Sequence, residues 1–325
     1  MKYFLFEFIT GGGLIGESLS NSLVREATHM LQTLIDELNS CCDAEVIITR
    51  DYRVEPFKGN VSQHVIDSSY HHALIKFIKE SDVSCLIAPE TNNYLYNLSE
   101  LFIKNAKTYI GSDLKSVELT SSKLKTNKTL MSANIHTPET IILGDDIPDS
   151  KLGWVVKPDD GVGAQDCCYF KSKSEIKDFL TKNNDNYVVQ PYLNGENISI
   201  SVLVYKNRVK LLSCNKLEIK IKNKLIYLDS IIVNEYLSYK NEMRELAENV
   251  VECIPGFSGY IGIDLIRSNE KLFVIDINPR FTTSLVGISE SLGVNVTEKI
   301  LKTFLTNEIQ DINIENAIPV KIKLL

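Results

Sequence analysis

Lys271-Leu-Phe-Val-Ile-Asp-Ile-Asn-Pro-Arg280 is an apolar run that ends in acidic, amide and basic side chains. Its β-branched and aromatic residues are typical of a buried strand. Asp276 and Asn278 are two positions apart, so on a strand both side chains project to one face. Pro279 has no N–H group to donate and ends the strand. The stretch therefore predicts a strand that presents two oxygen-bearing side chains near its end.

A second segment, residues 260–266, predicts a partner strand that carries Asp264. Carboxylate and amide oxygens suit Mg²⁺ bound to nucleotide phosphates, and Arg280 would meet charge on a transferring phosphoryl group. Asp264 and Asp276 share a face only if the loop near residues 268–272 has an odd length, because a one-residue shift in register reverses a side chain. Alternatively, the Asn-Pro pair simply marks a turn, so the metal-site hypothesis depends on the rest of the chain.

Two lysines upstream fit the same chemistry. Lys157 closes the apolar run 152–158 and precedes a loop with Gly161 and Gly163. Glycines let backbone N–H groups approach phosphate oxygens closely, and a lysine adds a point charge. Lys123 lies in a segment that is predicted to open a helix. The alternative for both lysines is a solvated surface charge, the commonest fate of this residue type.

Farther along, residues 186–205 predict two strands joined by a short turn. The first strand ends at Gln190-Pro-Tyr-Leu193, and Glu196 stands directly before the second. In chain order, the two lysines, the glycine loop, this Gly-Glu turn and the Asp-x-Asn-Pro-Arg hairpin resemble the ATP-grasp superfamily of carboxylate–amine ligases. The resemblance covers residues 110–290 with specific motifs and the N-terminal third more loosely.

The resemblance implies a nucleotide site, a metal site and a catalytic arginine. The lysines would hold the ATP phosphates, the hinge would touch adenine mostly through its backbone, and Glu196 would accept hydrogen bonds from the ribose hydroxyls. The implied ATP-binding residues are Lys123, Lys157, Gly161, Gly163, Gln190, Tyr192, Leu193 and Glu196. The implied ligands of two Mg²⁺ ions, for which Mn²⁺ could substitute, are Asp264, Asp276 and Asn278. Arg280 would face the acyl phosphate.

This chain departs from the family pattern at three positions. The family usually has glutamate where Asp276 stands, and its hinge often begins with glutamate where Gln190 stands. Many dipeptide ligases of the family carry arginine two residues before the first metal carboxylate, where this chain has Gly262. That difference argues against a D-alanine–D-alanine ligase.

The reaction implied by the resemblance is an ATP-dependent ligation. A substrate carboxylate would attack the γ-phosphate to give an acyl phosphate and ADP, and an amine would then attack the acyl carbon and release phosphate. Such transfer needs positioning and charge stabilisation more than covalent chemistry by the protein. The implied partners are a small carboxylic acid, such as the amino acid glutamate, an amine, and a second copy of the chain in a homodimer. A catalytically silent ATP-binding subunit is an alternative.

A glycine-rich segment near the N-terminus supports a different function. Gly11, Gly13 and Gly16 match G-x-G-x-x-G between a predicted strand and a predicted helix, the fingerprint of an NAD(P)-dependent oxidoreductase. However, the second predicted strand ends near Asp51, beyond the acidic residue expected about 20 positions on, and the C-terminal hairpin stays unexplained. In the ligase interpretation, Gly11, Gly12 and Gly13 would instead bind a substrate carboxylate through backbone N–H groups.

Two short segments narrow the resemblance. Residues 6–13, Phe-Glu-Phe-Ile-Thr-Gly-Gly-Gly, and residues 87–91, Ile-Ala-Pro-Glu-Thr, resemble a subgroup that includes tyramine–glutamate ligases of methanofuran-type cofactor synthesis. By that resemblance Glu7 and Glu90 would contact an amine substrate. The alternative is that each carboxylate stands at a strand end and binds nearby backbone.

The order of elements predicts α/β and α+β structure, in an ATP-grasp fold of three lobes with the nucleotide between the last two. Alternating strands and helices in residues 1–112 predict an α/β lobe with a parallel sheet. Residues 113–193 are the predicted central lobe, and residues 194–325 the C-terminal lobe with the metal site. The predicted strands include 2–9, 44–49, 83–88, 198–205, 208–214, 225–233, 260–267 and 271–277. The predicted helices are 19–39, 72–79, 118–131, 239–253 and 291–305.

Between Lys216 and Lys224, four lysines alternate with apolar residues. The favoured interpretation is a solvated edge strand on which lysine prevents aggregation. The alternative is a cationic flap near the acyl phosphate, with Asn215 and Lys216 nearest the site.

Composition sets broad limits. The 325 residues are 44% hydrophobic and 24% charged, as in ordinary soluble globular proteins. The net charge of −7 argues against nucleic acid and anionic membranes as partners. No apolar run approaches the roughly 18 residues of a membrane span. The seven cysteines lack metal-binding spacing and favour reduced thiols in a cytoplasm.

Overall fold

Two β-sheets organise the chain. The computed structural model describes residues 1–41, 44–142, 146–163, 166–181, 183 and 186–323. We refer to residues 1–112, 113–193 and 194–325 as the first, central and C-terminal lobes, the division proposed from the sequence. No helix in the described ranges is long and apolar enough to cross a membrane.

The first sheet is parallel, with the strand order β3-β2-β1-β4-β5. Its strands are Lys2–Glu7 (β1), Glu45–Asp51 (β2), Val61–Ile66 (β3), Val83–Ile87 (β4) and Tyr109–Ile110 (β5). The helices of this lobe are Asn21–Cys41 (α1), His71–Glu80 (α2) and Tyr94–Asn105 (α3), with a 3₁₀ turn at Thr91–Asn93 (η1). The loops after β1 and β4 leave the same edge of the sheet, where the Phe8 N–H group donates to the Ile87 carbonyl at 2.8 Å.

Strand β1 is central because it is apolar on both faces. Tyr3 and Leu5 pack with buried residues of α1, whereas Phe4 and Phe6 pack with buried residues of α2 and α3. Burying one large apolar side chain contributes about 1.5–3 kcal/mol, so helices on both faces fix the strand. Glu7, the last residue of β1, is thereby held at the edge of the sheet where ligands bind in such folds.

The second sheet contains the remaining strands. Its order is β14-β13-β10-β11-β12-β8-β7-β9-β6, and β15 pairs with β12. The strands are Ile141–Ile142 (β6), Trp154–Pro158 (β7), Cys168–Phe170 (β8), Tyr187–Pro191 (β9), Glu196–Tyr205 (β10), Arg208–Lys222 (β11), Leu225–Val233 (β12), Gly259–Ser268 (β13), Lys271–Asn278 (β14) and Val320–Lys323 (β15). The helices are Leu114–Thr120 (α4), Lys123–Ser132 (α5), Lys173–Leu180 (α6), Leu237–Tyr239 (η2, 3₁₀), Lys240–Cys253 (α7), Leu285–Leu292 (α8) and Val296–Thr306 (α9).

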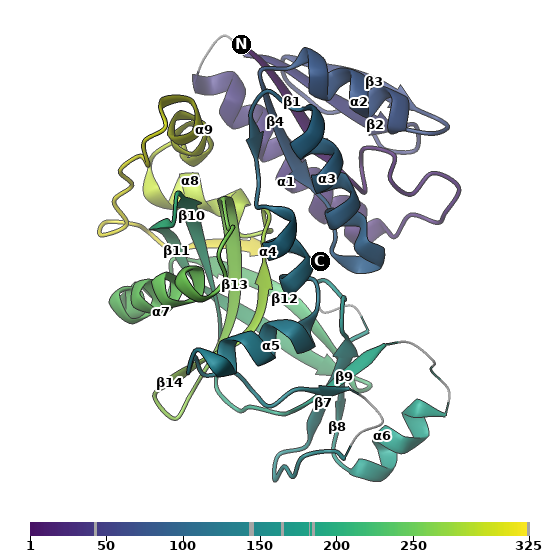
Figure 1. The fold of residues 1–325 in the computed structure, drawn as a ribbon, viewed down its shortest axis with the longest axis vertical. Coiled ribbons are helices and arrows are strands. Elements are labelled where there is room, and N and C mark those ends of the chain that lie inside the picture. Colours follow the sequence, from purple (N-terminus) through teal and green to yellow (C-terminus); the bar gives the residue numbers. More distant parts are fainter. Residues whose placement is uncertain (42–43, 143–145, 164–165, 182, 184–185, 324–325) are drawn as a thin grey trace.

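Figure 1 shows β1–β4 with their helices at one end of the molecule, β7–β9 with α6 at the other, and β10–β14 between them. Among the described residues, the small β6–β9 group joins the larger part of its sheet through one paired position, Leu225 with Cys168. The proposed boundary near residue 112 falls between the two sheets, and the one at residue 193 falls between two strands of the same sheet.

Two predicted helices are each divided in the structure. The predicted helix 118–131 is α4 and α5, because the side chain of Ser122 caps a new helix by accepting the Lys125 N–H group at 3.1 Å. The predicted helix 291–305 is the end of α8 and all of α9, which are separated by Gly293 at φ 65° and by the cap residue Asn295. A left-handed glycine commonly ends a helix. Lys123 therefore lies in the first turn of α5.

The lysine-rich segment belongs mostly to strand β11, which is longer than the predicted strand 208–214. Strand β11 extends to Lys222 and lies between β10 and β12. Pairing with β10 reaches Lys216, and residues 217–222 pair with β12 alone among the described strands. The predicted solvated edge is therefore found at residues 217–222, whereas Lys216 is paired on both sides.

Candidate active site

The hairpin of β13 and β14 brings the two aspartates opposite each other. Its turn is the two residues Asn269 and Glu270, both with positive φ, as in the tight turns that favour hairpins. Leu265 pairs with Val274, and the register then shifts so that Asp264 pairs with Asp276. The aspartates share a face, as predicted. The predicted odd-length loop is wrong, because the extra residue lies inside the strand as a β-bulge.

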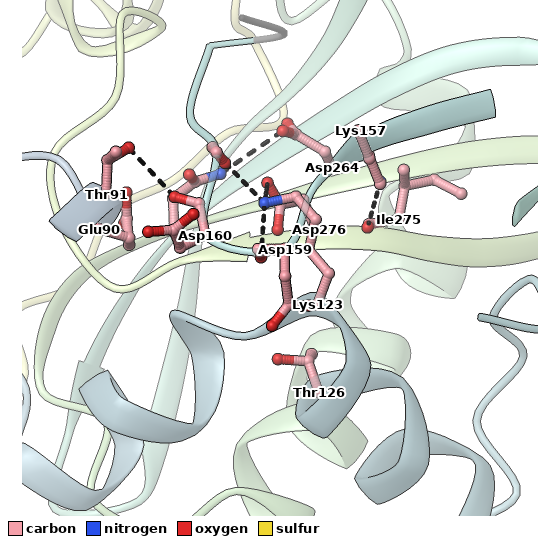
Figure 2. Close-up of polar contacts among 12 residues, drawn as sticks. Glu90, Thr91, Lys123, Thr126, Lys157, Asp159, Asp160, Asp264, Ile275 and Asp276 are labelled. Carbon is pink, nitrogen blue, oxygen red and sulfur yellow. Dashed lines mark hydrogen bonds and ion pairs between the residues drawn. The ribbon is translucent and has the colours of Figure 1, made fainter. Parts of the chain in front are cut away.

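Ile275 is the extra residue of this bulge, and its carbonyl points at a lysine. Lys157 Nζ donates to that carbonyl at 3.4 Å (Figure 2). The Lys157 side chain is buried, with 7% of its surface exposed. Burial lowers the pKa of Lys157, and the neighbouring Asp276 carboxylate offsets part of that effect. The bulge thus turns Asp276 towards Asp264 and also gives Lys157 an acceptor beside it.

Asp264 is held in an unfavourable electrostatic position. Burial and the facing Asp276 carboxylate raise the pKa of Asp264 to about 7. The Asn278 side-chain amide donates to Asp264 Oδ2 at 3.5 Å and offsets a part of this. A divalent cation between the two carboxylates would relieve their repulsion. Two carboxylates and an amide oxygen fit Mg²⁺, which takes one or two protein carboxylates and completes its shell with phosphate oxygens and water.

Lys123 joins three elements at the same point. Its Nζ donates to the Gly161 carbonyl at 2.6 Å and lies 3.6 Å from Asp276 Oδ2. Its backbone N–H donates to the Asp159 carbonyl at 3.1 Å, and Asp159 Oδ1 accepts the next N–H of α5, that of Leu124, at 2.8 Å. The first turn of α5 therefore holds Lys123 against both the glycine loop and β14.

One cavity brings together most of the residues predicted to bind ATP and metal. It is lined by the predicted residues Lys123, Lys157, Gly161, Gln190, Tyr192, Leu193, Asp264 and Asp276. Its remaining wall is largely apolar and includes Val155, Leu217, Ile219, Ile221 and Ile226. An apolar slot with charged groups at one end fits a nucleotide, whose base is flat and whose phosphates are anionic.

The apolar members of the lysine-rich segment line the cavity, which the sequence reasoning missed. Leu217, Ile219 and Ile221 line the nucleotide cavity, whereas Lys216 and Lys220 line a separate groove on β10–β12. The alternation in the sequence carried this signal, because residues two apart on a strand share a face. Asn215 is fully buried and binds Ser199 and Asn234. Asn215 shares the face of Asp264 through Ser199, but Lys216 and Lys220 do not line the cavity, so the alternative of a cationic flap is not supported.

Glu196 lies on the opposite face of the sheet from the metal-site aspartates. Ser199 pairs directly with Asp264, so Asn197, two residues earlier, shares that face and Glu196 does not. Glu196 lies 3.9 Å from Arg267, and Asn197 lines the cavity. The predicted contact of Glu196 with ribose does not fit this register. Asn197, one residue along, faces the cavity.

Two residues of the hinge, Gln190 and Tyr192, are hydrogen-bonded to other parts of the central lobe. Gln190 is buried in β9, and its side-chain amide donates to Thr140 Oγ1 at 2.7 Å. The Tyr192 N–H group donates to the Gly153 carbonyl at 2.9 Å. The Tyr192 N–H group is therefore already bonded within the protein, and contact of the hinge backbone with adenine stays a prediction for its other groups. Gly163 lies outside the cavity lining, at φ 58°, directly before residues that the structure does not describe.

Arg280 forms a buried ion pair with Glu90. The guanidinium Nε and Nη2 each lie 3.0 Å from a Glu90 carboxylate oxygen, and Nη2 also donates to Asn278 Oδ1 at 3.3 Å. Burial alone would lower the pKa of Arg280, but the Glu90 carboxylate outweighs it and raises that pKa. The pair connects the loop after β4 with the end of β14. The carboxylate of Glu90, for which an amine contact was predicted, is bonded to Arg280 in this structure.

The Glu7 carboxylate accepts hydrogen bonds from the backbone of the N-terminal glycine loop, which follows β1 and contains Gly11, Gly12 and Gly13. Glu7 Oε2 accepts the Thr10 N–H group at 2.6 Å, and Oε1 accepts the Ile9 N–H group at 3.1 Å. Burial raises the pKa of Glu7 against these hydrogen bonds. The structure therefore gives Glu7 the backbone-binding role that was its alternative, and the predicted amine contact does not fit.

Backbone N–H groups of the N-terminal glycine loop are also already hydrogen-bonded within the protein. The Gly11 N–H donates to the Glu7 carbonyl, and the Gly13 N–H donates to the Phe8 carbonyl. These two residues do not offer N–H groups to a substrate carboxylate, and of the predicted set only Gly12 has no such bond within the described chain. Helix α1 begins at Asn21, five residues after Gly16, rather than at the loop. The oxidoreductase alternative thus lacks the helix N-terminus that its fingerprint requires.

Comparison with known proteins agrees with this geometry. The profile of the ATP-grasp domain matches residues 120–284, just over half of the chain, and that of the pre ATP-grasp 3 domain matches residues 44–117. The chain belongs to the ATP-grasp family. Its predicted fold and its predicted class, an ATP-dependent carboxylate–amine ligase, are confirmed, and the oxidoreductase alternative is not favoured.

Three relatives show the extent of the similarity. The tyramine–L-glutamate ligase of Methanocaldococcus fervens is 24% identical over 87% of this chain and 88% of its own. That of Methanocaldococcus jannaschii is 26% identical over 70% of this chain and 65% of its own. The structure of N5-carboxyaminoimidazole synthetase from Staphylococcus aureus, complexed with ADP, superposes with a TM-score of 0.71 at 17% identity, over 98% of this chain and 81% of its own.

Proposed function

We propose that this protein is a ligase that joins the carboxylate of an amino acid such as glutamate to an amine, with Mg-ATP as the energy source and ADP and phosphate as products. The observation that carries the proposal is the convergence of Lys123, Lys157, Asp264 and Asp276 on one cavity with an apolar far wall. Four charged side chains at one end of an apolar slot suit a nucleoside triphosphate with its metal better than a neutral ligand.

The chain's own residues supply position and charge. Lys123 and Lys157 lie beside Asp276 at one end of the cavity and bind the phosphates as point charges. The carboxylates of Asp264 and Asp276, with the Asn278 amide oxygen, hold the metal. Arg280, fixed by Glu90, faces the transferring phosphoryl group. When bound, Mg²⁺ neutralises developing charge on the phosphate oxygens.

The metal content is part of the proposal. Two Mg²⁺ ions, replaceable by Mn²⁺, are expected at Asp264, Asp276 and Asn278. Among the described residues no group of three or more His, Cys, Asp and Glu side chains gathers as a metal site. The ions therefore depend on the nucleotide for their remaining ligands, and we expect metal binding and nucleotide binding to be mutually dependent.

The choice of substrates follows the curated relatives. Both methanogen relatives are named tyramine–L-glutamate ligases, at 24% and 26% identity. Glutamate and an aromatic amine are therefore the first candidates for the carboxylate and the amine. A cytoplasmic location and a homodimer belong to the same proposal. Cell fractionation tests the location, and sedimentation velocity tests the dimer.

The test is ADP formation from Mg-ATP with acids and amines added singly and in pairs, beginning with glutamate and tyramine. The proposal predicts that ADP and a new amide form together and that both substrates are required. ATP binding without turnover for any pair would favour the catalytically silent subunit. A chain that binds no ATP would contradict the proposal.

A further inference from the structure

Two consecutive aspartates, Asp159 and Asp160, attach the loop of Gly161 to two different parts of the molecule. Asp159 binds the first turn of α5, as described above. Asp160 instead reaches the first lobe, where its Oδ2 accepts the Asn92 N–H group at 2.9 Å. Its backbone carbonyl accepts the Thr91 hydroxyl at 3.1 Å (Figure 2). The loop that carries Gly161 is therefore attached both to the helix of Lys123 and to the lobe that precedes it.

The first-lobe segment that receives Asp160 also holds Arg280. Glu90 makes the two-point ion pair with the guanidinium, and Thr91 and Asn92 are the next two residues. Asn92 and Asn93 adopt φ of 54° and 57°, a left-handed conformation that asparagine tolerates better than most residues. This local backbone directs the Glu90 carboxylate to Arg280 and the Asn92 N–H group to Asp160. Three adjacent residues thus connect the glycine loop with the proposed catalytic arginine.

The charge of Asp160 is itself informative. A carboxylate in a loop that approaches nucleotide phosphates is repelled by them. A hydrogen bond from a backbone N–H group to a carboxylate is about twice as strong as one between neutral groups. The contact with Asn92 gives Asp160 a partner outside the phosphate site and so accounts for an acidic residue at this position.

We propose that Asp160 is a positioning residue that couples the glycine loop to the Glu90–Arg280 pair and so keeps water from the acyl phosphate until the amine attacks. This inference rests on the proposed function. In the productive step the amine nitrogen attacks the acyl carbon, the bond from that carbon to the phosphate oxygen breaks, and phosphate leaves with the proton that the nitrogen loses as the amide forms. In the competing step a water oxygen attacks the same carbon, the same bond breaks, and the original carboxylate returns.

Both steps consume one ATP, so the ratio of amide to ADP measures how well the acyl phosphate is shielded from water. We expect wild-type enzyme with glutamate and tyramine to form amide and ADP in equal amounts. In Asp160→Ala the amide formed per ADP falls by about twofold or more, because exclusion of water is what protects reactive intermediates. Asp160→Asn keeps an oxygen acceptor for the Asn92 N–H group and restores most of the ratio. A merely structural role would lower both products together and leave their ratio unchanged.

The matched control is Asp149→Ala. Asp149 is a fully exposed aspartate of the same lobe, paired with Lys173 at 2.9 Å. Its removal also deletes one negative charge and one exposed contact, here an ion pair, and the ratio of amide to ADP stays at the wild-type value. An unchanged ratio in Asp160→Ala, or an equal fall in Asp149→Ala, would overturn the proposal.

Hydrogen–deuterium exchange separates this inference from the proposed function. Peptides that cover residues 88–95 lose protection in Asp160→Ala and keep it in Asp149→Ala, whether or not the protein turns over substrate. If wild-type protein makes no amide from any pair, the proposed function fails and the coupling of Asp160 to an acyl phosphate fails with it. If wild-type protein is an active ligase and exchange at residues 88–95 is unchanged in Asp160→Ala, only the coupling fails.

Discussion

At the scale of single residues, Asp276 meets several demands with one carboxylate. It faces Asp264 across the hairpin and lies 3.6 Å from Lys123 Nζ. Asp276→Asn keeps the size of the side chain and removes its charge. We expect ADP formation to fall about 100-fold or more, the cost typical of removing one group that stabilises charge at an active site. The measurement is ADP release at saturating Mg-ATP, with circular dichroism to show that the fold is retained.

Asp229→Asn is the matched control for this experiment. Asp229 lies on β12 of the same sheet and also pairs with a lysine, Lys220, at 2.7 Å. Its substitution leaves ADP formation within about twofold of wild type, since exposed ion pairs contribute little. Equal losses in the two variants would remove the special role given to Asp276.

The raised pKa of Asp264 predicts how stability depends on pH in the absence of metal. Its folded pKa of about 7 lies above the ordinary value for an aspartate, so the unfolded chain loses the proton first. The contribution of Asp264 to stability therefore declines as pH rises from about 4 to about 7, and stays constant above that. Asp264→Asn resembles the protonated acid and avoids this loss. We expect the variant to gain roughly 1–3 kcal/mol in free energy of unfolding relative to wild type between pH 4 and pH 7.5.

Urea titrations of wild type and Asp264→Asn in EDTA at pH 4, 5.5 and 7.5 measure that difference. The account requires the stability of the variant relative to wild type to increase across the series. A difference that is constant with pH would mean that Asp264 is not strained by its neighbours. Saturating Mg-ATP should abolish the gain, because a bound cation stabilises the charged carboxylate.

At the scale of elements, the break between α4 and α5 determines where Lys123 lies. Ser122 caps α5, and Lys123 follows it in the first turn. Ser122→Ala removes the cap and costs about 1 kcal/mol of stability. It should also weaken ATP binding several-fold, because fraying of this turn releases Lys123 from Asp159 and Gly161. Calorimetry with Mg-ATP measures the second effect.

Ser172→Ala provides the comparison. Ser172 caps α6 in the same lobe, and its own N–H group donates a reciprocal hydrogen bond to the Glu175 carboxylate, so loss of the Ser172 hydroxyl has a similar cost in stability. Helix α6 contributes nothing to the cavity lining, and ATP affinity should stay at the wild-type value. If both variants lose affinity equally, general loosening of the lobe explains the effect rather than the position of Lys123.

The elements also show what the sequence could not predict. The strands of the hairpin follow from apolar runs and from Pro279, and both were predicted. The bulge at Ile275 has no local signal, because any apolar residue can occupy it and tertiary contacts such as that with Lys157 select the site. The face of Glu196 depended in the same way on register with Asp264, which a single strand does not reveal.

At the scale of the whole molecule, the Glu90–Arg280 pair links the two sheets. Both side chains are largely buried, with 5% and 12% of their surfaces exposed. Glu90→Gln leaves the guanidinium buried without a counter-charge. Breaking such a pair on one side typically costs about 3–5 kcal/mol, and we expect a loss of that size in urea unfolding.

Glu100→Gln is the surface counterpart. Glu100 pairs with Lys104 one turn along α3, and both are exposed. The expected loss is below about 0.5 kcal/mol. A loss in Glu90→Gln no larger than this would show that the two sheets do not depend on the pair.

Long-range pairing of this kind was beyond sequence reasoning. Glu90 and Arg280 were each singled out, but for a substrate amine and for an acyl phosphate respectively, and nothing in either motif indicates that they meet. Motifs with fixed spacing, such as Asp276 with Asn278, can be predicted from the sequence because one strand carries both residues. The groups that join different lobes, including Asp160 and Asn92, carry no spacing and appear only once the chain is folded.

The central claim is that a carboxylate is activated by phosphoryl transfer at the Asp264–Asp276 site. Glutamate labelled with ¹⁸O in its carboxylates, incubated with tyramine and Mg-ATP, tests it directly, because an acyl phosphate passes one carboxylate oxygen to phosphate. We predict one ¹⁸O atom in the inorganic phosphate for each amide formed, measured by mass spectrometry. Amide formation that leaves the phosphate unlabelled would contradict the account.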